Sequence, residues 1–205
     1  MRKTCIIISG GEASPIPPRR PGDLVIACDR GYVHARAAGV RCDLLISDFD
    51  SYTGDVDPAV ETLRYASEKD DTDTMLAVRY AVEHGWERLE LCCALGGRLD
   101  HAYANLQAAA YAARAGLSVR VCGNEDTVWF LRDGALTLPR QESCSLSVFA
   151  WSETCTGVDI HGTKYELTGG ELTNAFPLGV SNQWRQPQAQ IRVATGLLMI
   201  VVSKL

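Results

Sequence analysis

Short apolar runs alternate with longer, helix-periodic stretches through the N-terminal part of the chain. The apolar runs predict buried strands over Thr4–Ser9, Leu24–Cys28, Leu44–Ser47, Thr62–Ala66, Leu89–Ala94 and Ser118–Cys122. The stretches between them predict helices, each ending close to a glycine, over Gly31–Ala38, Thr74–Glu83 and Arg98–Ala115. Strands that alternate with helices indicate parallel βαβ units. We therefore expect an α/β domain over residues 1–124, with a mostly parallel, Rossmann-like sheet.

The pattern changes after residue 124. Short or alternating apolar runs, separated by glycine, proline, asparagine and aspartate, occupy Thr127–Leu131, Ala135–Leu138, Ser143–Ala150, Thr156–His161, Tyr165–Leu167 and Gln190–Ser203. This pattern is typical of antiparallel sheets with one buried face. We expect residues 125–205 to form a second domain, a β-sandwich.

Composition narrows the class of protein. An apolar content of 46% and a charged content of 22% are ordinary for a globular chain, and a net charge of −5 argues against a nucleic-acid partner. The longest late apolar run, Leu197–Val202, is far shorter than the ~20 residues of a membrane-spanning helix. The apolar start is too short for a signal peptide and is better explained as a first strand. We expect a cytoplasmic protein, without a membrane partner, whose eight cysteines are mostly buried thiols.

Three acidic clusters each come just past an apolar run. Asp48 and Asp50 follow Leu44–Ser47, a second cluster is Asp70-Asp71-Thr72-Asp73, and Asp100 lies beyond Leu89–Ala94. Asp29, after Leu24–Cys28, is expected at the same edge of the sheet. The carboxyl ends of parallel strands meet at one edge of a sheet, where open α/β folds bind ligands. Carboxylates gathered there repel one another unless a cation is present, so a hard ion such as Mg²⁺ is the simplest occupant. A polar turn without a metal is the alternative for Asp48 and Asp50.

A second acidic run, Lys69-Asp70-Asp71-Thr72-Asp73, comes just before a predicted helix. Aspartate and threonine are favoured at helix N-caps, so capping is the structural alternative to a binding role. Capping needs a single residue, however, and three aspartates occupy four positions here. We expect capping to account for one of these aspartates, and Lys69 to offer a cation to a phosphate.

The third motif, Gly96-Gly97-Arg98-Leu99-Asp100-His101 with Asn105 further on, lies between a predicted strand and a helix. Glycines at this place expose backbone N–H groups at a helix start, which suits phosphate binding. Arg98 offers paired donors for phosphate oxygens. A strand–helix turn with a solvated arginine explains the glycines alone, so we favour a binding role for Arg98, Asp100 and Asn105.

Taken together, the motifs resemble those of the thiamine pyrophosphokinase family. The family pattern runs from a D-G-G-like turn through G-D-F-D-S, K-D-x-T-D and G-G-R-x-D-H-x-x-x-N to a late S-N. The corresponding segments here are Asp29-Arg30-Gly31, Ser47-Asp48-Phe49-Asp50-Ser51, Lys69-Asp70-Asp71-Thr72-Asp73, Gly96 through Asn105, and Ser181-Asn182. Five motifs in this order are far more specific than any one alone. Arg30 and Ser47 depart from the pattern, because each stands where the family has glycine.

The resemblance implies transfer of the pyrophosphoryl group of ATP to the hydroxyl of thiamine, giving thiamine diphosphate and AMP. It implies a Mg²⁺ site formed by Asp48, Asp50 and Asp73 and supported by Asp70. It implies a nucleotide site that contains Asp29, Gly31, Lys69, Gly97, Arg98 and Asn105. Arg98 would also steady the phosphates during catalysis, and Asp100 would orient or deprotonate the thiamine hydroxyl.

The resemblance also implies a homodimer with its active sites at the subunit interface. Thiamine would lie there between the α/β domain of one subunit and the β domain of the other, with Ser181 and Asn182 on the β-domain side. Trp184 could stack on a thiamine ring, because a cationic thiazolium gains energy over an indole face. Ordinary core packing is the alternative for Trp184.

Two other functions remain open at the level of the sequence. A phosphatase of the aspartyl-phosphate type also places D-x-D after an apolar strand, but Tyr52 stands where that motif usually has Thr or Val. A non-catalytic sensor of a Mg-nucleotide or a thiamine compound would fit the departures at Arg30 and Ser47. The complete carboxylate clusters speak against such a sensor.

Overall fold

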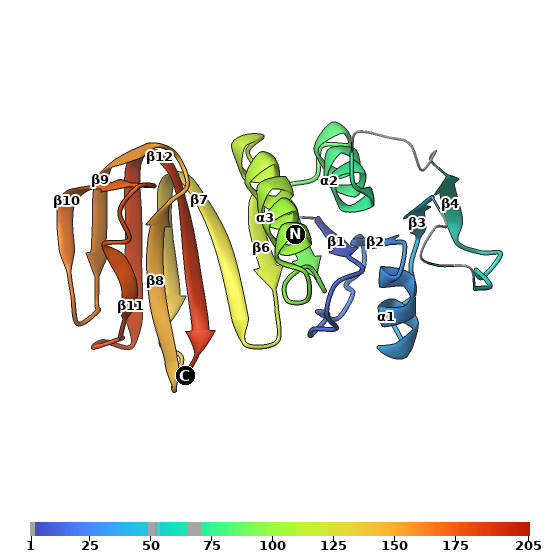
Figure 1. The fold of residues 1–205 in the computed structure, drawn as a ribbon, viewed down its shortest axis with the longest axis horizontal. Helices are drawn as coiled ribbons and strands as arrows, with labels where there is room; N and C mark the ends of the chain where they lie inside the picture. The colour runs from blue at the N-terminus through green and yellow to red at the C-terminus, as the bar shows by residue number, and fades with distance from the viewer. Residues whose placement is uncertain (1–2, 49–51, 53, 65–70) are drawn as a thin grey trace. The chain divides into compact units, whose positions relative to one another are not determined.

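The computed structural model describes residues 3–48, 52, 54–64 and 71–205. Over these residues the protein is mostly β-sheet with three helices, and it contains both parallel and antiparallel strand pairs (Figure 1). The chain divides into two compact units, Met1–Asn124 and Glu125–Leu205. No helix among the described residues is long and apolar enough to cross a membrane.

The strands of the first unit pair in parallel, in the order β6-β5-β1-β2-β3-β4. They are β1 Thr4–Ile8, β2 Leu24–Cys28, β3 Leu44–Ser47, β4 Glu61–Arg64, β5 Arg88–Cys92 and β6 Ser118–Cys122. Ile7, Ile26 and Leu45 are fully buried, as expected for a parallel sheet covered on both faces. The strand order reverses at β1, and the carboxyl ends of strands around such a reversal form the usual ligand-binding edge.

Three helices connect these strands, namely α1 Gly31–Ala37, α2 Asp73–Glu83 and α3 Leu99–Arg114. Helices α2 and α3 contact each other on one side of the strands, and α1 lies on the other side (Figure 1). Glycines with left-handed φ values, Gly39, Gly85 and Gly116, follow the three helices. The helix predictions are therefore confirmed to within one residue at each end.

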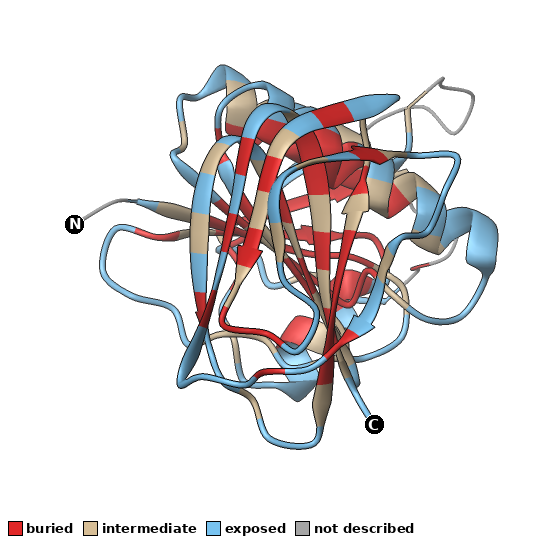
Figure 2. Ribbon diagram, turned by 90° about the vertical axis from the view of Figure 1, so that its left-hand side faces the viewer, coloured by how far each residue is buried: buried red, intermediate tan, exposed pale blue. Residues whose placement is uncertain are grey.

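The described strands of the second unit pair in antiparallel fashion. They are β7 Asp126–Pro139, β8 Cys144–Ala150, β9 Thr154–His161, β10 Leu167–Thr173, β11 Gly179–Asn182 and β12 Gln188–Lys204. The long strand β12 pairs with β7 along most of its length, with β9 in its first half and with β8 in its second half. Buried residues alternate with exposed or half-buried ones along β9 and the first half of β12, so one face of these strands supplies the core, whereas residues 145–148 of β8 are all buried (Figure 2).

Gly196 lies where β12 changes partners. Its φ is 119°, and the β12–β7 register shifts between Val193 and Leu197. A Cβ at Gly196 would lie 2.8 Å from Cys155 Sγ, so a larger residue would clash there. The glycine therefore allows the close approach of β12 to the start of β9.

The strand predictions for the second unit differ from the structure at three points. Thr127–Leu131 and Ala135–Leu138 belong to the single strand β7, because β12 pairs with residues on both sides of the break. Tyr165–Leu167 is wrong as a strand, since Tyr165 lies in a bend and β10 begins only at Leu167. The strand β11 is short and mostly polar or exposed, and no apolar run marks it.

All eight cysteines are free, and seven of them are buried. Burial raises the pKa of the Cys42 thiol to about 11, with a further contribution from the charge of Asp43. Such a thiol stays protonated at neutral pH, and a protonated thiol is a poor metal ligand. The expectation that the cysteines are mostly buried, reduced thiols is confirmed.

Candidate functional site

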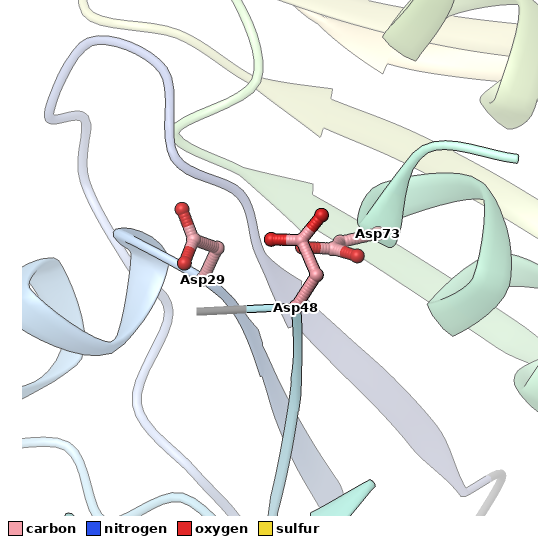
Figure 3. A group of neighbouring side chains, drawn as sticks. All are labelled: Asp29, Asp48 and Asp73. Carbon is pink, nitrogen blue, oxygen red and sulfur yellow. The ribbon is translucent and has the colours of Figure 1, made fainter. Parts of the chain in front are cut away.

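Three aspartate carboxylates meet at the edge of the first unit's sheet (Figure 3). Asp29 follows β2, Asp48 follows β3, and Asp73 is the first residue of α2. One carboxylate oxygen of each residue lies within 4.8 Å of the others. Asp29 is buried, and the other two are half-buried. Because β2 and β3 are adjacent parallel strands, their carboxyl ends place Asp29 and Asp48 beside each other.

The backbone at Asp29 is held in a left-handed conformation with a φ of 47°. Aspartate tolerates this conformation better than most residues other than glycine. The Asp29 N–H donates to the Ile46 carbonyl at 3.0 Å, and the Tyr32 N–H donates to the Asp29 carbonyl at 3.0 Å as α1 begins. The first bond attaches the turn between β2 and α1 to the neighbouring strand β3, and the second closes the turn itself.

Gly31 lies in the same turn, and packing requires it to be glycine. A Cβ at this position would lie 1.9 Å from the Ile8 carbonyl oxygen, so only glycine lets α1 start so close to β1. This contact explains the glycine without a ligand. The place of Gly31 in the nucleotide site stays a prediction.

The start of α2 brings Asp73 to the other two aspartates. Thr72 is the N-cap of this helix, and its hydroxyl accepts a hydrogen bond from the Met75 N–H at 3.1 Å. The expectation that one of the aspartates provides the cap is therefore wrong. Asp71 instead pairs with Arg79 at 2.8 Å. A 2.7 Å hydrogen bond between the hydroxyls of Ser9 and Thr74 ties the start of α2 to the end of β1.

Three carboxylates at this separation repel one another, and a divalent cation would relieve the repulsion. Carboxylate oxygens are the ligands that Mg²⁺ and Mn²⁺ prefer, so the residues present suit such an ion. The group contains two of the predicted metal ligands, Asp48 and Asp73, and adds Asp29, which the motif resemblance assigns to the nucleotide site. The signal for Asp29 was present in the sequence, since it follows β2 as Asp48 follows β3. The remaining predicted ligands, Asp50 and Asp70, and also Lys69, lie outside the described residues.

Arg98 and Asp100 form an ion pair with each other at the start of α3. The Arg98 Nε and Nη2 atoms donate to the two carboxylate oxygens of Asp100 at 3.1 and 2.6 Å. Hydrogen bonding from Arg98 is the main cause that lowers the pKa of Asp100 below its ordinary value. The two residues line a surface pocket of about 650 Å³ with Leu99 and Tyr103. Asp100 does not belong to the group of three carboxylates among the described residues.

The residues on either side of this ion pair shape the turn from β5 to α3. Gly97 has a φ of 66°, which favours glycine, and no atom lies within 4 Å of the place where its Cβ would be. Asn105 is buried, and its Nδ2 donates to the Ala94 carbonyl at 2.9 Å. This bond connects α3 to the segment that follows β5, so Asn105 stabilises the fold at this point. The nucleotide-binding roles of Gly97 and Asn105 stay predictions.

In the second unit, the side-chain amide of Asn182 stabilises the turn that contains Thr163 and Tyr165. Its Oδ1 accepts from the N–H groups of Tyr165 and Gln183 at 3.0 and 2.9 Å. Its Nδ2 donates to the Tyr165 carbonyl at 2.6 Å and to Thr163 Oγ1 at 3.1 Å. An asparagine amide offers two donors and two acceptor positions, so all four are used here. A direct contact between Asn182 and thiamine stays a prediction.

The neighbours of Asn182 differ in exposure. Ser181 is exposed, has a φ of 56°, and donates its N–H to Ser147 Oγ at 3.0 Å. Trp184 is only 6% exposed and belongs to the hydrophobic core with Leu146 and Ile191. The structure therefore favours the packing alternative for Trp184 over stacking on a ligand.

Comparison with known proteins agrees with the motifs. Two family models match in succession, the catalytic domain of thiamin pyrophosphokinase over residues 20–121 and its vitamin B1 binding domain over residues 135–198. Thiamine pyrophosphokinase of Bacillus subtilis is 26% identical to the chain over 98% of its length and 99% of that protein.

Solved structures of such enzymes share the fold. A crystal structure of thiamine pyrophosphokinase from Bacillus subtilis gives a TM-score of 0.85 at 23% identity, covering 99% of both chains. Thiamin pyrophosphokinase from Geobacillus thermodenitrificans gives a TM-score of 0.82 at 25% identity, covering 99% of this chain and 98% of that one. With both domain models matched in order, the chain belongs to the thiamine pyrophosphokinase family.

Proposed function

We propose that the chain transfers the pyrophosphoryl group of ATP to the hydroxyl of thiamine, with Mg²⁺ held by Asp29, Asp48 and Asp73. Family membership gives the enzyme type, a transferase that acts on thiamine and forms thiamine diphosphate. The observation that supports the metal site is the convergence of three carboxylate oxygens within 4.8 Å. Family membership does not favour the phosphatase or the sensor.

The reaction joins the thiamine hydroxyl oxygen to the β-phosphorus of ATP. The bond from that phosphorus to the oxygen bridging the α-phosphate breaks, and AMP leaves with the bridging oxygen. Such a transfer depends mainly on positioning and on neutralising phosphate charge. Asp29, Asp48 and Asp73 would hold a magnesium ion, which would supply positive charge to the phosphate oxygens. Asp50 and Asp70 remain proposed as further ligands.

Arg98 is the proposed phosphate-binding side chain. It is 74% exposed, and its paired N–H groups already bind one carboxylate, that of Asp100, in the geometry that suits a phosphate. Asp100, the present partner of Arg98, is proposed to orient or deprotonate the thiamine hydroxyl. Lys69, Gly97 and Asn105 complete the proposed nucleotide site.

The two compact units are proposed to act as an α/β domain and a β-sandwich domain of a cytoplasmic homodimer. Thiamine would bind between the first domain of one subunit and the second domain of the other. The support is the motif resemblance and the match of residues 135–198 to a vitamin B1 binding domain. Ser181 is the proposed contact on the second domain, and Asn182 shapes the turn beside it.

The proposal is tested by measuring AMP release from MgATP with and without thiamine. We expect the wild type to release AMP only with thiamine, and Asp48→Asn to lower that rate by about 10²–10³-fold. Circular dichroism confirms that the variant is folded. Release of phosphate without thiamine, thiamine binding without AMP release, or an unchanged rate in Asp48→Asn would each contradict the proposal.

A further inference from the structure

We propose that Ser47 is a positioning residue that holds the Asp29 carboxylate ready for a divalent cation. Ser47 is the last residue of β3 and stands directly before Asp48. Its side chain is completely buried, and its hydroxyl donates to Asp29 Oδ1 at 2.9 Å. This inference rests on the proposed metal site, but it concerns a residue that the motif pattern of the family does not contain.

Strand β3 holds Asp29 at two points. The Ile46 carbonyl accepts the Asp29 backbone N–H at 3.0 Å, and the next residue, Ser47, reaches the Asp29 side chain. The first bond fixes the backbone of Asp29 and the second restricts the rotation of its carboxylate. A ligand whose orientation is fixed by a neighbouring hydrogen bond loses less conformational entropy when it binds a metal.

The Ser47 hydroxyl also changes the electrostatics of the group. Its O–H dipole points its positive end at one carboxylate in a group of three like charges. A donor in this position offsets part of the repulsion among them before an ion binds. An ionised carboxylate has acceptor positions for more than one partner, so the bond to Ser47 leaves Asp29 able to ligate a cation.

A bland interpretation is that Ser47 merely fills space in a buried strand. A completely buried hydroxyl needs a hydrogen-bond partner, and a backbone carbonyl would satisfy it equally well. In the structure the Ser47 hydroxyl donates to a carboxylate that belongs to the group of three. Glycine, the residue of the family pattern, has no side chain to make this bond, so we expect the effect in chains that carry a hydroxyl here.

The test measures Mn²⁺ binding in the absence of nucleotide and thiamine, by the loss of the paramagnetic resonance signal of free Mn²⁺. Four proteins are compared, the wild type, Ser47→Ala, Asp29→Asn and the double variant. We expect Ser47→Ala to raise the dissociation constant about 10-fold. In the Asp29→Asn background the same change should have no further effect, because the carboxylate that Ser47 positions is already gone.

Ser145→Ala is the matched control. Ser145 is also a buried serine of a β-strand, but it lies in β8 of the second unit and does not belong to the carboxylate group. We expect this change to leave Mn²⁺ affinity within about twofold of the wild type, because it removes a buried hydroxyl without touching a proposed ligand. Equal weakening in Ser145→Ala would show that the loss of any buried hydroxyl weakens Mn²⁺ binding, and would overturn a specific role for Ser47.

In the AMP assay, the same variants distinguish weaker Mg²⁺ binding from a general loss of catalytic activity. Ser47→Ala should raise the Mg²⁺ concentration for half-maximal rate about 10-fold while the rate at saturating Mg²⁺ stays near that of the wild type. If Ser47→Ala does not fold, Ser47→Cys keeps the volume but is a weak donor, and the same shift is expected. Unchanged Mn²⁺ affinity in the folded variant overturns the role of Ser47. Absence of thiamine-dependent AMP from the wild type overturns the proposed function instead.

Discussion

The carboxylate edge of the first unit and the Asn182 turn of the second unit use polar residues in opposite ways. At the turn, one neutral amide satisfies four hydrogen-bonding groups of its own unit. At the edge, three negatively charged side chains from β2, β3 and α2 come together within 4.8 Å. The first arrangement satisfies hydrogen-bonding groups of the fold, whereas the second brings like charges together, and a bound cation would offset their repulsion.

The comparison shows that a residue in a family motif can serve the fold or the chemistry. The S-N motif places its asparagine inside a hydrogen-bonded turn, and the acidic motifs place theirs where like charges meet. Only the second arrangement gathers like charges, whose repulsion a divalent cation would offset. Substitutions at the carboxylate edge should therefore lower mainly activity, whereas substitutions in the Asn182 turn should lower mainly stability.

The largest effect is expected for Asp73→Asn, with Asp71→Asn as its control. Both aspartates precede or begin α2, but only Asp73 belongs to the carboxylate group, whereas Asp71 pairs with Arg79 on an exposed face. We expect Asp73→Asn to lower thiamine-dependent AMP release by about 10²–10³-fold. Asp71→Asn should lose only an exposed ion pair, which contributes little to stability, and keep its activity. Equal inactivation by both changes would break the distinction.

An intermediate effect, on stability, is expected for Asn182→Ala. The change removes the acceptor of the Tyr165 N–H and the donor to the Tyr165 carbonyl and Thr163 Oγ1, which keep only their bond to each other. We expect a cost of about 1–3 kcal/mol in the free energy of unfolding. Urea denaturation measures this loss. The KM for thiamine, measured well below the melting temperature, should change little. A large rise in that KM with unchanged stability would instead make Asn182 a ligand contact.

The smallest effect is expected for Arg98→Ala on the titration of Asp100. Arg98 lowers the pKa of this carboxyl, so removing it should raise the pKa toward the ordinary value of about 3.9. A depressed carboxyl pKa adds stability above the pKa of the unfolded chain and loses it as the pH falls through the folded pKa. Both side chains are largely exposed, so the stability change should be minor.

A pH titration followed by carboxyl ¹³C NMR measures the pKa of Asp100 in the wild type and in Arg98→Ala. Arg79→Ala, which removes the cation beside Asp71 instead, is the control and should leave Asp100 unchanged. If the titration of Asp100 is the same with and without Arg98, the ion pair at the start of α3 does not form in solution.

Much of the first unit could be predicted because its signals are local. Helix periodicity with glycine C-caps placed α1, α2 and α3, and apolar runs placed β2, β3 and β6 with their exact bounds. The rule that carboxyl ends of parallel strands share an edge predicted that Asp48 lies near other site residues. The same rule covers Asp29, whose membership of the carboxylate group follows from the adjacency of β2 and β3.

The remaining features depend on contacts between residues far apart in sequence. The sequence around Asn182 does not indicate that its amide hydrogen-bonds to Thr163 and Tyr165. Likewise, the sequence around Asn105 does not indicate its bond to Ala94. The bond from Ser47 to Asp29 likewise requires two strands to be in register. Strands β10 and β11 were missed because their pairing, and not an apolar pattern, defines them.

The central claim is that Asp29, Asp48 and Asp73 form a divalent-cation site. Crystals grown with MnCl₂ and a non-hydrolysable ATP analogue test it most directly, through the anomalous scattering of manganese. We predict an anomalous peak within bonding distance of oxygens from all three carboxylates, and its disappearance in Asp48→Asn. A manganese peak bound elsewhere, or none at this edge with the nucleotide in place, would contradict the claim.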